Sequence, residues 1–298
     1  MAKSKVGILG LGIMGSAMAG SLLRAGFRVI GYDPVPACRG RHRKAGGIVA
    51  HSAGDVAGSA RILITSLPSA DALAGISKEL AEKEHRNLVV IETSTLPIEV
   101  KEAARRRLAR AGVTLLDCPL SGTGAQARVK DLIVFASGAP AAFKRTVPVL
   151  NGFARGHYFV GKFGNGSKMK FAANLLVAIH NVSAAEAFVL GMKAGLAPRT
   201  ILRVAGDGAG ASRMFQVRGP MMAAGRYRRA TMKNEVWQKD MKIIRAFARS
   251  LRVRTPLFDA SATVYAAAMQ RGYARQDTAA VCAVLEAMAG LKRKRRKT

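Results

Sequence analysis

The glycine pattern near the N-terminus constrains the fold of this chain more than any other feature. The stretch GLGIMG places Gly10, Gly12 and Gly15 between an apolar, strand-like run and a helical pattern. In such a βα turn the first glycine permits the tight turn, the second lets the backbone approach a pyrophosphate, and the third lets the helix pack closely on the strand. A helix that begins at Ile13 and Met14 offers unpaired N–H groups to an anion. The pattern therefore predicts a dinucleotide-binding turn, with an unliganded glycine-rich turn as the plainer alternative.

An acidic residue follows at the end of the next predicted strand, FRVIGYD. Asp33 lies roughly 20 residues after the glycine motif, the spacing at which a carboxylate accepts hydrogen bonds from the adenosine ribose hydroxyls. Such a carboxylate repels a 2′-phosphate and favours NAD. Arg39, Arg41 and Arg43 follow directly and could instead bind a 2′-phosphate. We therefore expect NAD or NADP as cofactor, with NAD favoured.

Apolar runs and helical periods alternate along the first half of the chain. Strands are predicted at 5–12, 27–33, 61–67, 87–92, 113–117 and 131–137, with helical patterns between the early ones. This alternation predicts βαβ units around a parallel sheet, that is, an α/β doubly wound domain of the Rossmann type. After Phe163 only helical patterns remain, at 167–194, 198–205, 232–249, 256–271 and 277–291. We predict three parts: a dinucleotide-binding domain at 1–163, an all-α substrate and dimerisation domain at 164–291, and a disordered basic tail at 292–298.

The charge of the chain is unusual. Its 48 Lys and Arg against 18 Asp and Glu give a formal net charge of +30. The basic residues gather in three runs, Cys38 to Lys44, Lys101 to Arg110 and the terminal LKRKRRKT. We interpret these runs mainly as solvated helix faces and a frayed tail, with nucleic-acid binding as the alternative.

The cysteines and the N-terminal sequence predict the cellular compartment of the protein. The three cysteines are widely spaced and include no C-x-x-C pair, so we expect neither a disulfide framework nor a metal site. The N-terminal stretch has no small-residue cleavage site, and no apolar run reaches about 18 uninterrupted residues. We therefore expect a soluble, cytoplasmic protein in a reducing compartment.

Two polar stretches are candidates for substrate contacts. The tract Ser121, Gly122 and Thr123 follows a predicted strand and exposes hydroxyl and N–H groups that suit a carboxylate, although an ordinary flexible turn is an equal alternative. In GNGSKMKFAAN, helical residues advance about 100° each, so Lys170 and Asn174 share a face while Lys168 points away. Asn181 lies close to the same face, so this otherwise apolar helix has a polar stripe, which suggests that the helix lines a cleft. Lys170 is then either a general acid/base or a lysine whose side chain only reaches out to water.

Together these motifs make the chain resemble the β-hydroxyacid dehydrogenase family, which includes 3-hydroxyisobutyrate dehydrogenase and is related to 6-phosphogluconate dehydrogenase. The family's opening motif G-x-G-x-M-G is matched by Gly10, Gly12, Met14 and Gly15, and its substrate motif D-x-P-V-S-G-G is matched by Asp117, Pro119, Ser121 and Gly122. The catalytic motif of the family, G-x-G-x-x-x-K with a later Asn, is matched by Gly164, Gly166, Lys170 and Asn174. Two short motifs also match: S-T at Ser94 and Thr95, and K-D at Lys239 and Asp240. The resemblance covers about Val6 to Leu291.

The resemblance implies an oxidoreductase that transfers hydride between a nicotinamide cofactor and a small β-hydroxy acid, in a dimer or tetramer. By this resemblance Lys170 is the general acid/base and Asn174 orients the substrate. The substrate carboxylate is bound by Ser121, Gly122 and Thr123. The nicotinamide has Leu67, Pro68 and Thr95 as neighbours, and Lys239 contacts both cofactor and substrate.

Departures from the family pattern bear on the substrate. Gln126 to Leu132 replaces the family's G-A-x-x-G-T-L continuation, and Ala173 replaces an Asn. A different or more anionic hydroxy acid, such as a sugar acid, is therefore as plausible as 3-hydroxyisobutyrate. Two other functions stay open: a reductase of small aldehydes or sugar-acid semialdehydes, and a non-enzymatic nucleic-acid-binding protein. Lys170 argues against an imine reductase, because imine-reducing relatives commonly lack this lysine.

Overall fold

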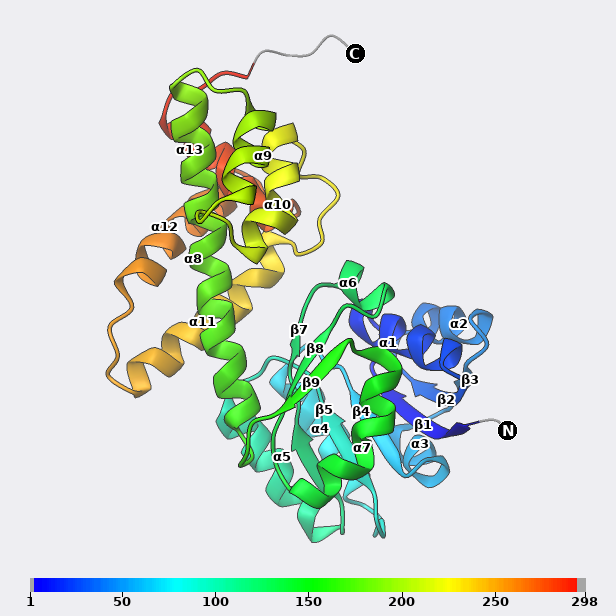
Figure 1. Cartoon of the computed structure of the whole chain (residues 1–298). Coiled ribbons are helices and arrows are strands. Elements are labelled where there is room, and N and C mark those ends of the chain that lie inside the picture. Colours follow the sequence, from blue (N-terminus) through cyan, green and yellow to red (C-terminus); the bar gives the residue numbers. More distant parts are fainter. Residues whose placement is uncertain (1–2, 294–298) are drawn as a thin grey trace. The chain divides into compact units, whose positions relative to one another are not determined.

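The computed structural model describes residues 3–293. Its contacts divide the chain into two compact units that meet in sequence after Lys170. The first unit is built on a parallel sheet and the second consists of helices, so the predicted fold class is confirmed (Figure 1). The start of the predicted basic tail is described at Lys292 and Arg293, and residues 294–298 lie outside the described part of the chain.

The first unit contains a six-stranded sheet in the order β3, β2, β1, β4, β5, β6. The strands are β1 (Lys3–Leu9), β2 (Phe27–Tyr32), β3 (Ile48–Val49), β4 (Ile62–Thr65), β5 (Val89–Glu92) and β6 (Thr114–Asp117), and all of their pairings are parallel. The central strands are apolar and buried on both faces, which is what helices on both sides of a parallel sheet require.

Two apolar cores flank this sheet. One core is formed with α1 (Ile13–Arg24), α6 (Gly124–Arg128) and α7 (Pro140–Phe153), and the other with α3 (Ala53–Ser59), α4 (Ala70–Leu80) and α5 (Ile98–Arg110) (Figure 1). Helix α2 (Pro36–Lys44) follows β2 and places Cys38 and His42 inside the unit. Gly26, with φ +85°, follows the end of α1 and turns the chain into β2, as a glycine after a helix end commonly does.

A second, smaller sheet was not predicted. Strands β7 (Leu120–Ser121), β8 (Ile133–Ala136) and β9 (Gly156–Phe159) form it, and β7 runs antiparallel to β8. Of its strands only β8 was expected, since β7 has two residues and β9 reads GHYF, which lacks a continuous apolar run. The two-residue strand β3 escaped prediction for the same reason.

The second unit packs helices around the long helix α8 (Asn165–Lys193), whose first residues belong to the first unit. The others are α9 (Pro198–Asp207), α10 (Arg213–Ala224), α11 (Asn234–Ser250), α12 (Pro256–Gln270), the 3₁₀ turn η1 (Thr278–Ala280) and α13 (Val281–Met288). Helix α10 was missed because it contains the dipeptide Gly219-Pro220, which ordinarily indicates a turn. Length and apolarity alone would let α8 span a membrane. Its Ala178, Ala185 and Phe188 are fully buried, and 39% of its most apolar 18-residue window is buried.

Candidate active site

The carboxyl ends of the parallel strands form one aligned edge in the first unit. Leu9 pairs with Tyr32 on one side and with Thr65 on the other, Thr65 pairs with Glu92, and Glu92 pairs with Asp117. The strand order reverses direction between β1 and β4. Ligands of open α/β sheets bind outside the carboxyl ends at such a switch point. The predicted cofactor residues of this unit follow these strand ends.

The glycine turn leaves room for a ligand at one position only. Gly10 has φ +93°, and a Cβ there would lie 2.2 Å from the Ser66 carbonyl oxygen. A Cβ on Gly15 would lie 1.8 Å from the Gly10 carbonyl oxygen, whereas a Cβ on Gly12 would meet nothing within 4 Å. Gly10 and Gly15 are thus required by the turn itself. The open space at Gly12, at the N-terminus of α1, is a cradle that fits the pyrophosphate of a dinucleotide.

The two residues that follow Gly12 differ in their surroundings. The side chain of Ile13 is 74% exposed at the start of α1, while Met14 packs against the core. Their backbone N–H groups lie in the first turn of α1, where a helix supplies no acceptor of its own. Ile13 and Met14 therefore present backbone donors beside the cradle.

Asp33 is buried against the same turn. One carboxylate oxygen accepts a hydrogen bond from the Leu11 N–H at 2.7 Å, and the other accepts from the Val35 N–H at 2.8 Å. The Arg39 guanidinium donates to the backbone carbonyls of Asp33 (2.6 Å) and Pro34 (3.0 Å). Asp33 thus holds a fixed negative charge next to the cradle, and Arg39 is engaged by the backbone.

The turn after β4 is joined to the turn after β5. The Leu67 N–H donates to the Ser94 hydroxyl at 2.9 Å, and the Ser94 N–H donates to a Glu92 carboxylate oxygen at 2.9 Å. Pro68 is exposed beside Leu67, and Thr95 is half-buried. The predicted nicotinamide-side residues Leu67, Pro68 and Thr95 therefore lie on two adjacent turns that share a hydrogen bond.

The predicted carboxylate-binding tract is an ordered turn. Ser121 ends β7, Gly122 has φ +136°, and Thr123 caps the five-residue helix α6. The Gln126 side chain accepts from the Thr123 N–H at 3.0 Å and donates to Asp131 at 3.1 Å. The substituted loop residue Gln126 therefore fastens this turn from within.

The two lysines of the α8 start differ in exposure. Lys168 is exposed, and its ammonium donates to the Asn165 side chain at 3.3 Å. Lys170 is only 8% exposed. The first turn of α8 is held by Ser167, whose N–H and hydroxyl both donate to Asp117 at 2.8 Å. Lys170 is therefore buried and Lys168 exposed, as expected for two side chains that point in different directions from one helix.

The second unit contains the remaining predicted residues. The Asn174 amide donates to the Asp240 carboxylate at 2.9 Å, and the Lys239 ammonium lies 3.9 Å from the same carboxylate. Asp240 therefore brings Asn174 and Lys239 together. The cleft-lining role suggested for Asn181 is wrong, because its amide is buried and donates to the Tyr265 hydroxyl and the Thr278 carbonyl at 2.9 Å each.

Sequence reasoning missed a buried ion cluster. Lys101 was interpreted as part of a solvated helix face, yet it is fully buried, with its ammonium 2.6 Å from Glu92 and 2.8 Å from Asp117. Burial by itself would lower the pKa of Lys101, but the two carboxylates outweigh it and hold the pKa above its usual range. The signal was present in the helical period, since Lys101 shares the buried face of α5 with Ala104 and Leu108.

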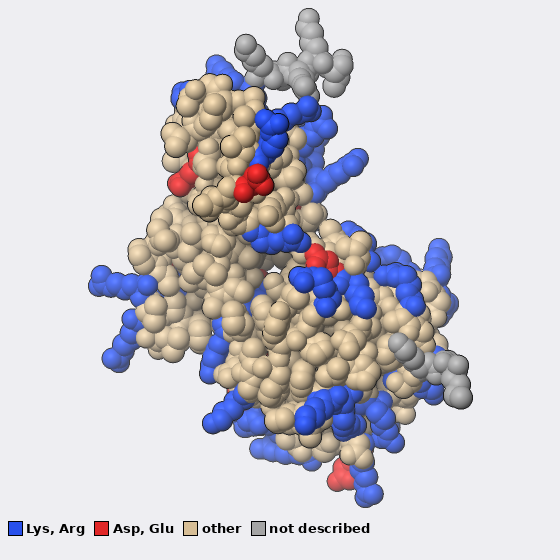
Figure 2. Space-filling view, viewed as in Figure 1, with Lys and Arg blue, Asp and Glu red and all other residues tan. Residues whose placement is uncertain are grey.

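Basic side chains spread over the surface. Figure 2 shows Lys and Arg over much of the drawn face, with few acidic groups. Positive surface charge raises the local concentration of anions such as hydroxy acids and dinucleotides. The net charge of +30 thus suits anionic small molecules as well as polyanions.

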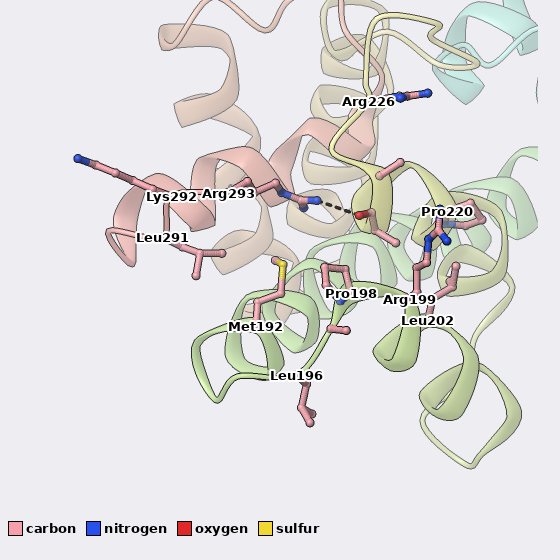
Figure 3. A pocket seen from close by; sticks show the side chains of 13 residues that line it. Met192, Leu196, Pro198, Arg199, Leu202, Pro220, Arg226, Leu291, Lys292 and Arg293 are labelled. Carbon is pink, nitrogen blue, oxygen red and sulfur yellow. Dashed lines mark hydrogen bonds between the residues drawn. The ribbon is translucent and has the colours of Figure 1, made fainter. Parts of the chain in front are cut away.

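A pocket of about 800 Å³ lies in the second unit, and none of the predicted site residues lines it. Its wall includes Met192, Leu202 and Pro220, with Arg199 at its side (Figure 3). Arg293 donates to the Ala223 carbonyl at 2.9 Å, the bond drawn in Figure 3. Arg293, the second residue of the tail predicted to be disordered at 292–298, is held by this hydrogen bond.

Comparison with known proteins places the chain in a family. Residues 5–161 match the NAD-binding domain of 6-phosphogluconate dehydrogenase, and residues 164–285 match the domain described as NAD-binding of NADP-dependent 3-hydroxyisobutyrate dehydrogenase. L-threonate dehydrogenase of Cupriavidus necator is 33% identical, over 93% of this chain and 94% of that protein.

Solved structures agree with these matches. A 3-hydroxyisobutyrate dehydrogenase from Salmonella typhimurium superposes with a TM-score of 0.84 at 29% identity, covering 95% of this chain and 100% of that one. The Mycobacterium tuberculosis 3-hydroxyisobutyrate dehydrogenase with L-serine gives a TM-score of 0.86 at 25% identity, covering 96% and 99%. The chain belongs to the 3-hydroxyisobutyrate dehydrogenase-like family of β-hydroxyacid dehydrogenases and is an NAD(P)-dependent oxidoreductase.

Proposed function

We propose that the chain oxidises a small hydroxy acid of the sugar-acid class, with Lys170 as general acid/base. Similarity to L-threonate dehydrogenase supports this substrate class, because threonate is a short acid with several hydroxyl groups. The altered substrate loop, in which Gln126 bonds to Thr123 and Asp131, supports a substrate other than 3-hydroxyisobutyrate.

The proposed reaction divides between cofactor and protein. The nicotinamide, when bound, accepts the hydride that leaves the carbon of the alcohol. The Lys170 amine takes the hydroxyl proton as the C–O bond becomes a carbonyl, so a hydride and a proton leave the substrate along separate paths. In the reverse direction the Lys170 ammonium returns this proton. Ser121, Gly122 and Thr123 would hold the carboxylate, and Asn174 would orient the reacting hydroxyl.

NAD is the proposed cofactor rather than NADP. Asp33 places a carboxylate beside the cradle at Gly12, where it would accept from ribose hydroxyls and repel a 2′-phosphate. Arg39, the nearest of the three arginines along the chain, already donates to two backbone carbonyls. Both features weigh toward NAD.

The contrast between Lys168 and Lys170 carries the proposal. A general base must be held in place and shielded from bulk water, and Lys170 is 8% exposed on a helix whose first turn is fastened to Asp117. Lys168, two residues earlier, is exposed. A lysine that only snorkels to water would resemble Lys168 rather than Lys170.

We also propose self-association through the helical unit. Leu176 and Leu190 on α8 are 50% and 74% exposed, and Leu196 after it is 53% exposed. Apolar side chains of this size, exposed along one helix and the segment after it, suit a surface between copies of the chain. Gel filtration at the monomer size would remove this part of the proposal.

A substrate panel tests the proposed function. Nicotinamide absorbance would be followed with NAD and NADP against L-threonate, other sugar acids, 3-hydroxyisobutyrate, and small aldehydes in the reductive direction. The proposal expects the highest kcat/KM with a sugar acid and NAD. Turnover only with aldehydes and NADPH would favour the semialdehyde reductase. No turnover together with DNA binding that weakens steeply with salt would favour the nucleic-acid-binding protein.

A further inference from the structure

We infer that Glu92, Lys101 and Asp117 form a buried charge cluster that positions Lys170 for proton transfer. The Lys101 ammonium lies 2.6 Å from Glu92 and 2.8 Å from Asp117, and all three side chains are at most 1% exposed. The cluster lies wholly in the first unit, at the carboxyl ends of β5 and β6. The inference rests on the proposed role of Lys170.

Stability alone does not account for this cluster. Removing charges from water costs several kcal/mol per ion, and well-packed apolar side chains can often replace a buried ion pair without loss of stability. A buried cluster of two carboxylates and one ammonium is better explained by the hydrogen bonds that its carboxylates can accept. These bonds run in two directions from Lys101.

The Asp117 carboxylate fastens the start of α8. It accepts from the Ser167 N–H and hydroxyl at 2.8 Å each and from the Ser137 hydroxyl at 3.3 Å. The Ser137 hydroxyl in turn accepts from the Gly166 N–H at 2.9 Å. A Cβ on Gly166 would lie 2.6 Å from the Asp117 carbonyl oxygen, so only glycine permits this approach.

The Glu92 carboxylate fastens the turns beside the proposed nicotinamide site. It accepts from the Ser94 N–H at 2.9 Å, and the Ser94 hydroxyl accepts from the Leu67 N–H at 2.9 Å. Lys101 joins the two carboxylates, so one continuous network reaches from Leu67 to Ser167.

This network fixes two parts of the reaction relative to each other. Ser167 lies three residues before Lys170 on α8, so holding Ser167 sets both the height and the rotation of Lys170 on its helix. Leu67 lies on the turn proposed to face the nicotinamide. A displacement of about 1 Å between reacting groups can cost about 100-fold in rate, so a rigid link between these two turns serves catalysis. Glu92, Lys101 and Asp117 are positioning residues in this account.

Asp117→Asn tests the link while keeping the side-chain shape. The amide can still accept from Lys101 but can no longer accept from both Ser167 donors, and the cluster loses its excess negative charge. On the best panel substrate, kcat should fall by about 100-fold with a larger primary deuterium isotope effect. The dissociation constant for NADH, measured by calorimetry, should change by less than about threefold.

Asp277→Asn is the matched control. Asp277 is also buried and bonds to Arg218 at 3.1 Å and to the Thr231 N–H at 2.7 Å, but it lies in the second unit. It should lower stability without changing the isotope effect. If Asp117→Asn does not fold, Ser167→Ala is the substitute, because it removes only the hydroxyl bond to Asp117. Ser167→Ala should lower kcat, and Ser167→Thr, which keeps a hydroxyl, should have the wild-type kcat.

Two readouts separate positioning from general destabilisation. If Asp117 acts through Lys170, Asp117→Asn should cost little in a chain that already carries Lys170→Met. Hydrogen exchange should also quicken at the amides of Ser167 to Lys170. An equal loss of rate in both backgrounds, or unchanged exchange, would overturn the inference. If no panel substrate turns over, the proposed function fails, and exchange alone decides whether the cluster holds this helix start.

Discussion

The Asn174 side-chain amide donates a hydrogen bond to the Asp240 carboxylate at 2.9 Å, and both residues are buried. Because a carboxylate accepts and does not donate, this bond fixes which end of the amide points at Asp240. The Asn174 carbonyl oxygen is thereby directed away from Asp240, as a residue that orients a substrate hydroxyl requires. Asp240 also lies 3.9 Å from the Lys239 ammonium.

Loss of this acceptor should weaken substrate binding. With Asp240→Ala, the Asn174 amide can rotate, and we expect KM for the hydroxy acid to rise about tenfold, since a charged hydrogen bond contributes about 1.5–3 kcal/mol. KM for NAD should change little. Steady-state kinetics with both substrates varied would check this. Asp259→Ala, which removes an exposed carboxylate bonded to Arg245, is the control and should leave both values unchanged.

Cofactor preference should respond to Asp33. With Asp33→Asn, the charge that repels a 2′-phosphate is gone, and we expect the ratio of kcat/KM for NADP to that for NAD to rise about tenfold, or about 1.4 kcal/mol. Arg43→Ala, on the exposed part of α2, should leave the ratio unchanged. A ratio that stays the same in Asp33→Asn, or that changes only in Arg43→Ala, would contradict the assignment of NAD to Asp33.

Stability should depend on pH through His42. The ring is buried against two glycines, and a Cβ on Gly47 would lie 2.1 Å from it. Burial lowers the pKa of His42, against smaller opposing effects of hydrogen bonds with the Val29 and Ile48 backbone. The folded chain therefore binds this proton more weakly than the unfolded chain.

The free energy of unfolding should consequently fall as pH drops below about 6.5, the unfolded pKa, by at most about 1.4 kcal/mol per pH unit. The contribution is fully present above that pH and stops decreasing below the folded pKa. Denaturant titrations between pH 5 and 8 would measure it, and His42→Gln should remove it. His51→Gln, at an exposed position, should not; equal slopes in the wild type and both variants would exclude His42 as the source.

Much of the fold could be predicted from local sequence patterns. The glycine turn at Gly10 to Gly15 and the alternation of strands with helices were sufficient to predict the doubly wound unit, because backbone geometry restricts which residues form such turns. Helical geometry also predicted that Lys168 and Lys170 point in different directions. These features depend on residues close together in the sequence.

Features that depend on distant partners were not predicted. Lys101 belongs to a strongly basic run, and its burial depends on Glu92 and Asp117, which the fold brings together from neighbouring strands. Asn181 shares the helix face of Lys170, yet its partner Tyr265 comes from α12. Short strands such as β7 exist only because β8 supplies their hydrogen bonds. Tertiary pairing, rather than local preference, decides these cases.

The most direct test of the central claim compares Lys170→Met with Lys168→Met. Both variants replace a lysine on the same helix by an apolar side chain of similar length, so they differ mainly in position. On the best panel substrate, Lys170→Met should lower kcat by at least about 100-fold, as expected for loss of a general acid/base, while its NADH affinity is retained. Lys168→Met should keep wild-type kcat within about twofold. Equal activity in the two variants would contradict the assignment of Lys170.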